Sequence, residues 1–164
     1  MWGENMAITD FKLITDRTQE DVARHAELKA KGWQSMTAEE KSEWQTSLKG
    51  GYNYTDLNRV ESAVEYVAQK LTEAGYIVIP VIKKNWKVTD KPTLEDMKRY
   101  MQNVSDIRKA LATFSTTPNA PTTEQKLNYQ MANAMEQILI DVDDLIGRMI
   151  AAYFYSADLY SGEV

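Results

Sequence analysis

Cysteine is absent from this chain, and histidine occurs only once, at position 25. The lack of cysteine excludes disulfides, thiol nucleophiles and cysteine metal sites. A single histidine excludes most zinc sites and leaves His25 as the only base for a serine triad. The sequence also lacks the glycine-rich nucleotide-binding motifs and the G-x-S-x-G element of many hydrolases. The best-known catalytic and nucleotide-binding arrangements are therefore missing.

Long apolar runs and an excess of positive charge are missing too. No run approaches the roughly 18 apolar residues of a membrane span. The opening "MWGENMAITDF" lacks the charged and apolar regions of a signal peptide. The net charge of -5 argues against nucleic-acid binding, which needs clustered Lys and Arg. We therefore expect neither a membrane nor a nucleic acid as partner, and synthesis in a cytoplasm.

The pattern that is present is helical. Apolar residues recur at spacings of three and four over 57–71, 94–114 and 127–153, which predicts three long helices. With short links, such helices form an up-down bundle. The stripe of the last helix, expected from Thr122 to about residue 155, is wide enough to indicate burial on more than one side. The segment "STTPNAPT", residues 115–122, is a linker by composition, and we expect it to reverse the chain.

The N-terminal part is predicted to be smaller helices. Residues 1–14 are typical of a flexible arm, and residues 15–50 of a helical hairpin. Asp16 or Thr18 can cap a first helix ending near Lys31, and Thr37 opens a second helix over 38–49 with Glu40 completing a capping box. The pair Gly50-Gly51 then reads as a helix stop at which positive φ costs little.

The segment "YIVIPVIKKNWKV", residues 76–88, has a different period. Its β-branched residues favour a short β-hairpin turning at 83–85, with the basic patch at its exposed tip. Pro80 favours instead an edge strand or an irregular extended segment. The predicted fold is therefore all-α, with a single helical domain over 15–164 that consists of the hairpin and a three-helix bundle over 51–164, and with a β-hairpin near 76–88 as an open alternative.

Few side chains suggest chemistry. Asp21, one turn before His25, can favour the charged form of the imidazole, but a lone histidine on a short helix is typically a half-buried surface residue. Asp141 and Asp144 share a helix face, whereas Asp143 points elsewhere, so the three are best explained as a solvated face. We predict no catalytic residue, no metal and no cofactor.

The aromatic residues offer a surface for interaction. Aromatic anchors dominate the energetics of protein interfaces, and they also fill cores and stack on sugars. The candidates for an interaction surface are Trp33, Trp86, Tyr153, Tyr155 and Tyr160.

Several segments carry a resemblance to a known family: "DRTQEDV", "GWQSMTAEEKSEW", "LKGGYNYTDLNRVESAVEYV", "PTLEDMKRY", "LNYQMANAMEQILIDVDDLI" and "YSADLYSGEV". Together they resemble a poorly characterised family encoded among the virion structural genes of phages and prophages of Gram-positive bacteria. "YNYTDLNRVE" is the most specific piece, and the likeness runs from about Asp16 to Val164. The resemblance implies a place in the tail or baseplate region, and it implies no catalytic or ligand-binding residues.

Three functions follow as expectations. The first is a virion structural or adaptor protein, assembled in the bacterial host cytoplasm, that contacts other virion proteins or itself as a homo-oligomer. The second is a module that binds host-surface glycan through exposed aromatic rings. The third is a small enzyme acting through carboxylates such as Asp141, Asp143 and Asp144, which the residues favour least.

Overall fold

The computed structural model describes residues 6–122 and 126–161, with side chains described as far as residue 156. It contains five α-helices: α1 (Gln19–Lys31), α2 (Ala38–Thr46), α3 (Tyr54–Glu73), α4 (Leu94–Lys109) and α5 (Tyr129–Ser161). Two short 3₁₀ turns, η1 (Ile8–Phe11) and η2 (Trp33–Ser35), complete the elements. No strand occurs in the described ranges. The all-α prediction is confirmed, and the β-hairpin near 76–88 is wrong.

The three long helices pack together around one core, as the apolar stripes predict. Each helix contributes fully buried aliphatic side chains, among them Val60 and Leu71 of α3, Ile107 of α4, and Ile138 and Ile146 of α5. Stripes at helical spacing meet in this way because burying them removes apolar surface from water.

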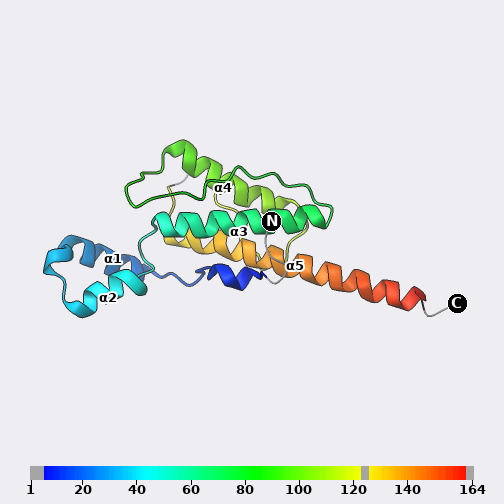
Figure 1. Ribbon diagram of the computed structural model, residues 1–164, viewed down its shortest axis with the longest axis horizontal. Helices are drawn as coiled ribbons and strands as arrows, with labels where there is room; N and C mark the ends of the chain where they lie inside the picture. Colours follow the sequence, from blue (N-terminus) through cyan, green and yellow to red (C-terminus); the bar gives the residue numbers. More distant parts are fainter. Residues whose placement is uncertain (1–5, 123–125, 162–164) are drawn as a thin grey trace.

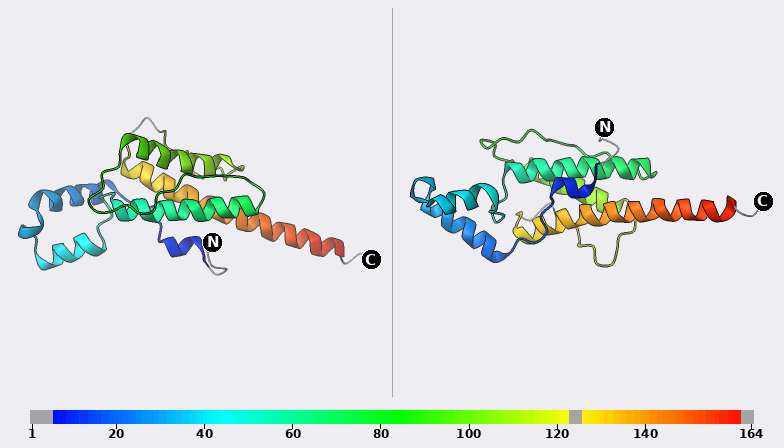
Figure 2. Two further views of the ribbon diagram at one scale, coloured as in Figure 1. Left: turned by 45° about the horizontal axis from the view of Figure 1, so that its top comes forward. Right: turned by 60° about the horizontal axis from the view of Figure 1, so that its bottom comes forward.

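The direction of the helices differs from the prediction. All three run the same way along the long axis of the molecule, so the bundle is parallel and not up-down (Figures 1 and 2). Ion pairs show the register of α3 and α5: Arg59 pairs with Glu136, and Lys70 pairs with Asp143 further along both helices. The amino-terminal ends of the three helices therefore meet at one end of the bundle.

Long connections make the parallel arrangement possible. Residues 74–93 join α3 to α4, and residues 110–128 join α4 to α5. An extended chain rises about 3.3 Å per residue, so either connection can return along the roughly 30 Å of α3. The up-down prediction is wrong because it treated these connections as short links.

The first connection lies as an extended segment in contact with α3 and α4. The backbone N–H of Trp86 donates to Asn58 Oδ1 at 2.9 Å, and the N–H of Lys83 donates to Glu61 Oε2 at 2.7 Å, both on α3. The N–H of Val81 donates to Asn103 Oδ1 of α4 at 3.1 Å. Polar side chains of the helices thus take the hydrogen bonds that a strand partner would supply.

The segment before α1 also packs on the bundle. Although its composition is typical of a flexible arm, Phe11 is buried, with its ring centroid 5.3 Å from that of Tyr66 on α3. The N–H of Ile14 donates to Glu136 Oε2 of α5 at 2.6 Å. The arm is therefore fixed to both α3 and α5 in its described part, residues 6–14.

The helical hairpin of α1 and α2 forms as predicted. Thr18, and not Asp16, caps α1, and Thr37 caps α2, each in a capping box. Gly32, at φ 76°, ends α1. The two helices are joined by ion pairs between Arg24 and Glu43 at 2.7 Å and between Lys31 and Glu40 at 2.6 Å.

The glycine pair after α2 has a different role from the predicted one. Gly50 and Gly51 do not have positive φ; instead they lie directly against α1. A Cβ on Gly50 would lie 1.9 Å from the carbonyl oxygen of Asp21, and a Cβ on Gly51 would lie 2.3 Å from His25 Nε2. The pair is needed so that the chain can pass α1 on its way to α3.

We expect Gly50→Ala to lower the free energy of unfolding by about 2 kcal/mol, because backbone atoms of α1 must move to admit the methyl group. Gly147→Ala is the matched control: it meets no atom within 4 Å and replaces a glycine inside a helix, so it is expected to stabilise by about 0.5–1 kcal/mol. Urea denaturation measures both values. Equal stability of Gly50→Ala and wild type would contradict the close approach.

Candidate interaction surfaces

The last turns of α5 extend beyond the bundle (Figure 1). Among the described side chains of this helix, which end at residue 156, Ile146 is the last buried one, and all those after it are exposed. We call residues 147–161 the α5 extension; at 1.5 Å per residue it is about 22 Å long. Tyr153 is 72% exposed, Phe154 64% and Tyr155 73%.

The extension is apolar on every side over Met149–Tyr155, a run without a charged residue. A helix of this kind is normally buried, because an isolated surface helix needs a polar face. Large exposed apolar patches on soluble proteins mark sites of interaction. The extension is therefore the strongest candidate interaction surface in the described part of the chain.

The five aromatic residues predicted to form an interaction surface do not lie together in the structure. Tyr153 and Tyr155 lie on the extension, and Phe154, which the sequence analysis did not select, lies beside them. Tyr160 is in the last turn of α5, but its side chain lies outside the described residues. Trp33 is half-exposed on the distant hairpin, with Lys41 Nζ 5.5 Å from its ring centroid.

Trp86 is the exception, because it is only 4% exposed and cannot belong to a surface. Its indole N–H donates to Glu61 Oε1 at 3.2 Å, and Lys83 Nζ lies 3.5 Å from its ring centroid. Lys84 and Lys87 are exposed, as expected for the basic patch, but Trp86 between them is buried. The glycan-binding prediction consequently loses one of its two tryptophans.

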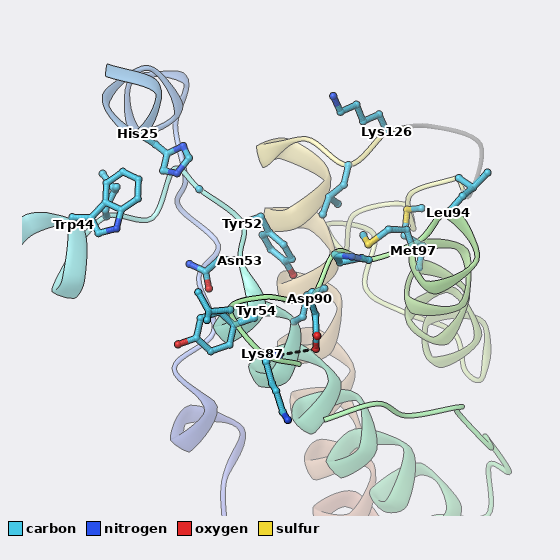
Figure 3. Close-up of a pocket in the computed structure, with 17 residues that line it drawn as sticks. His25, Trp44, Tyr52, Asn53, Tyr54, Lys87, Asp90, Leu94, Met97 and Lys126 are labelled. Carbon is cyan, nitrogen blue, oxygen red and sulfur yellow. Dashed lines mark hydrogen bonds between the residues drawn. The ribbon is translucent and has the colours of Figure 1, made fainter. Parts of the chain in front are cut away.

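A second surface is a pocket of about 810 Å³ between the hairpin and the amino-terminal ends of α3, α4 and α5 (Figure 3). We call it the end pocket. Its wall is largely apolar and aromatic, and its polar lining includes His25, Asn53, Asp90 and two lysines, Lys87 and Lys126. Its apolar lining residues include Trp44, Leu48, Leu57, Val88, Pro92, Leu94, Met97, Met101 and Leu127. No local sequence pattern predicts it, because the lining comes from segments far apart in the chain.

His25 forms one side of the end pocket and stacks on Trp44, with ring centroids 5.2 Å apart. Burial, together with the charge of Lys29, lowers the pKa of His25 below its usual value of 6.5. The expectation that Asp21 favours the charged imidazole is therefore wrong: the neutral ring is favoured here.

The lowered pKa of His25 predicts a loss of stability in mild acid. The unfolded chain binds the proton more readily than the folded chain, so the contribution of His25 is complete above about pH 6.5 and falls as the pH drops toward the lower folded pKa. Thermal unfolding between pH 5 and 7 measures this. The variant His25→Phe keeps a ring against Trp44 and is expected to remove this part of the pH dependence; an unchanged profile would contradict the assignment.

The acidic residues of α5 are engaged with neighbours and do not converge. Asp143 pairs with Lys70 of α3 at 2.5 Å, Asp144 pairs with Arg148 at 2.9 Å, and Asp141 accepts a hydrogen bond from Gln137. Within the described ranges, no three His, Asp or Glu side chains gather in a way that could hold a metal ion. No helix in those ranges is both long and apolar enough to cross a bilayer.

A buried cluster of charges lies near the same end of the bundle. Arg17 Nη2 is 3.1 Å from Asp56 Oδ1, and Arg17 Nη1 is 2.8 Å from Glu136 Oε1. Arg59 Nη2 contacts the same two carboxylates at 2.5 and 3.2 Å. The two positive and two negative charges thus neutralise one another. The cluster therefore has a structural role, since it joins the N-terminal segment to α3 and α5.

Comparisons of the chain with protein-family models, with curated proteins and with solved structures find no match. The geometry of these surfaces and the resemblance in the sequence are therefore the two grounds for a function.

Proposed function

We propose that this protein is a structural or adaptor component of a phage-derived virion, associated with the tail or baseplate, and that it acts through protein–protein contact by the α5 extension. One observation carries the proposal: a charge-free helical run, Met149–Tyr155, stands away from the bundle with its aromatic rings in solvent. Such a helix gains stability when another protein covers it. The virion setting comes from the resemblance in the sequence.

The chemistry of the chain agrees with such a role. The carboxylates that the sequence offers as catalytic candidates, Asp141, Asp143 and Asp144, point to separate partners. The buried carboxylates Glu61 and Glu136 are each held by arginine. The most exposed aromatic rings in the described part of the chain, those of Tyr153, Phe154 and Tyr155, instead gather on one element, as expected for a surface that binds another protein.

The virion assignment is tested on particles purified from a host that carries the gene. We expect mass spectrometry to detect the chain in intact particles at a constant ratio to the other virion proteins. If particles from a host with the unaltered gene assembled fully and lacked the chain, the assignment would be overturned. A double variant of the gene, Tyr153→Ser with Phe154→Ser, is expected to give particles from which the chain is missing.

A matched control separates loss of contact from loss of folding. The variant Ile79→Asp changes an apolar side chain that is also exposed, but on the connection before α4. It is expected to remain in the particles. If the Ile79→Asp chain and the double-variant chain were missing from the particles to the same degree, a specific role for the α5 extension would be contradicted.

A further inference from the structure

The molecule has two uncovered apolar surfaces of opposite shape at opposite ends of its long axis. The α5 extension is convex and projects from one end, whereas the end pocket is a hollow near the other (Figures 1 and 3). The parallel order of α3, α4 and α5 creates this polarity, because it places all three helix starts at the pocket end. A single chain cannot join the two surfaces, since α5 leads away from the pocket.

We propose that the end pocket binds the α5 extension of a second copy of this chain, so that copies associate head to tail. This rests on the proposed function, because it names the partner of the same contact helix. A dimer in which two α5 extensions contact each other would leave both end pockets uncovered. Only a second copy docked head to tail covers both surfaces with one contact.

The sizes of the two surfaces agree. Successive helix residues point about 100° apart, so Tyr153 and Phe154 share a face with Met149 and Ile150, whereas Tyr155 lies on another side. Aromatic side chains bury about 150–250 Å² each, so the rings of Tyr153 and Phe154 bring about 300–500 Å² to one contact. A standard protein interface buries about 800 Å² on each partner, which the neighbouring Met149 and Ile150 help to reach. The pocket volume of about 810 Å³ lies in the range of cavities that enclose several such groups.

The charges of the two surfaces are complementary. Lys87 and Lys126 line the pocket and are exposed, and Asp90 is the acidic residue among its lining residues. Beyond Arg148, the sequence contains two acidic residues, Asp158 and Glu163, and no basic residue. Arg148 itself is paired with Asp144, so the sequence after it is net negative, whereas the charged pocket lining, two lysines against one aspartate, is net positive. This difference favours the head-to-tail orientation and weakens with salt.

Head-to-tail contact is heterologous, so repeated association closes into a ring or grows into a filament. Both outcomes suit a component present in several copies. The contact also predicts a complementation experiment, because each chain has one donor surface and one acceptor surface that can be inactivated separately.

The experiment uses the full-length chain in sedimentation velocity over a wide range of concentration. Variant one, Tyr153→Ser with Phe154→Ser, loses the donor surface. Variant two, Leu94→Asp, places a charge in the pocket at an exposed position in the first turn of α4, where an acidic residue suits the helix. Ile79→Asp is the control, and circular dichroism checks the folding of each variant.

We expect wild type and Ile79→Asp to form oligomers, and each of the other two variants to associate roughly thirtyfold more weakly. Mixing variant one with variant two restores one intact contact, so a dimer of one copy each is expected. Dimers of the Leu94→Asp variant alone would show pairing between extensions and overturn the proposal. A monomeric wild type would also overturn it, whereas the particle experiment above would still decide the proposed function.

Discussion

Glu136→Gln is expected to lower the free energy of unfolding by about 3–5 kcal/mol, which is the typical cost of removing one partner from a buried charge pair. Glu136 is completely buried and neutralises two guanidinium groups, those of Arg17 and Arg59. Without its charge, Asp56 alone faces both cations. Urea denaturation followed by circular dichroism measures the loss.

Asp144→Asn is the matched control, since Asp144 pairs with Arg148 on the same helix, with both side chains largely exposed. Exposed pairs contribute little, so no measurable change in stability is expected. If the Glu136→Gln variant were as stable as this control, the burial of the charge cluster would be contradicted.

The cluster also has a local consequence that hydrogen exchange can detect. The N–H of Ile14 donates to Glu136 Oε2, and the N–H of Arg17 donates to Asn133 Oδ1 at 3.1 Å. Glu136→Gln is therefore expected to reduce the protection of the Ile14 amide more than that of Arg17. Combining Glu136→Gln with Arg17→Met is expected to cost less than the sum of the single variants, because the two groups share one interaction.

Buried ion pairs often add less stability than apolar residues of the same size, so we infer that their value here is specificity. In the described part of the N-terminal segment, Phe11 is buried, and Met6, Ile8 and Leu13 pack against the core while remaining partly exposed. The charges of this cluster pair only when the segment lies in the correct register. The cluster therefore fixes residues 14–17 in place against α3 and α5. The double variant above tests this, since loss of register leaves the Ile14 amide exposed.

Local features of the fold could be predicted from the sequence because the interacting residues are neighbours. The capping boxes of Thr37 with Glu40 and Thr93 with Asp96 each lie within four residues, and both form. The apolar stripes likewise depend only on helical spacing. The boundaries were less accurate: α5 begins at Tyr129 after the cap of Asn128, and not at Thr122.

Features that depend on distant residues could not be predicted. The direction of α4 depends on the path of residues 74–93, which is determined by contacts with Asn58, Glu61 and Asn103. In this connection Ile77, Ile79 and Val81 are exposed while their apolar neighbours are half-buried, so the alternation gives no sign of which face is inward. The same limit explains why the burial of Trp86 could not be predicted, since Lys84 and Lys87 on either side of it are exposed.

Of the two candidate surfaces, the α5 extension could be predicted from the sequence and the end pocket could not. Tyr153 and Tyr155 could be selected because the wide apolar stripe of α5 continues past the length that a bundle covers. The end pocket could not, because His25, Leu57 and Leu94 meet only after the hairpin and three helix starts are in place.

Trp86→Ala is the second variant with a large expected effect, a loss of about 3–5 kcal/mol in the free energy of unfolding. The buried ring occupies space beside α3, and its removal leaves a cavity under the connection between α3 and α4. The variant also removes the indole donor to Glu61, although Arg99 still pairs with that carboxylate at 2.6 Å. Urea denaturation again gives the value.

Two further variants separate packing from hydrogen bonding. Trp86→Phe keeps a buried ring but loses the indole N–H and part of the ring volume, so a smaller loss than that of Trp86→Ala, about 1–2 kcal/mol, is expected. Val88→Ala, in the same connection but largely exposed, is expected to stay within about 0.5 kcal/mol of wild type. If Trp86→Ala were as stable as Val88→Ala, the connection would not be held by its ring, and the path that makes the bundle parallel would need another anchor.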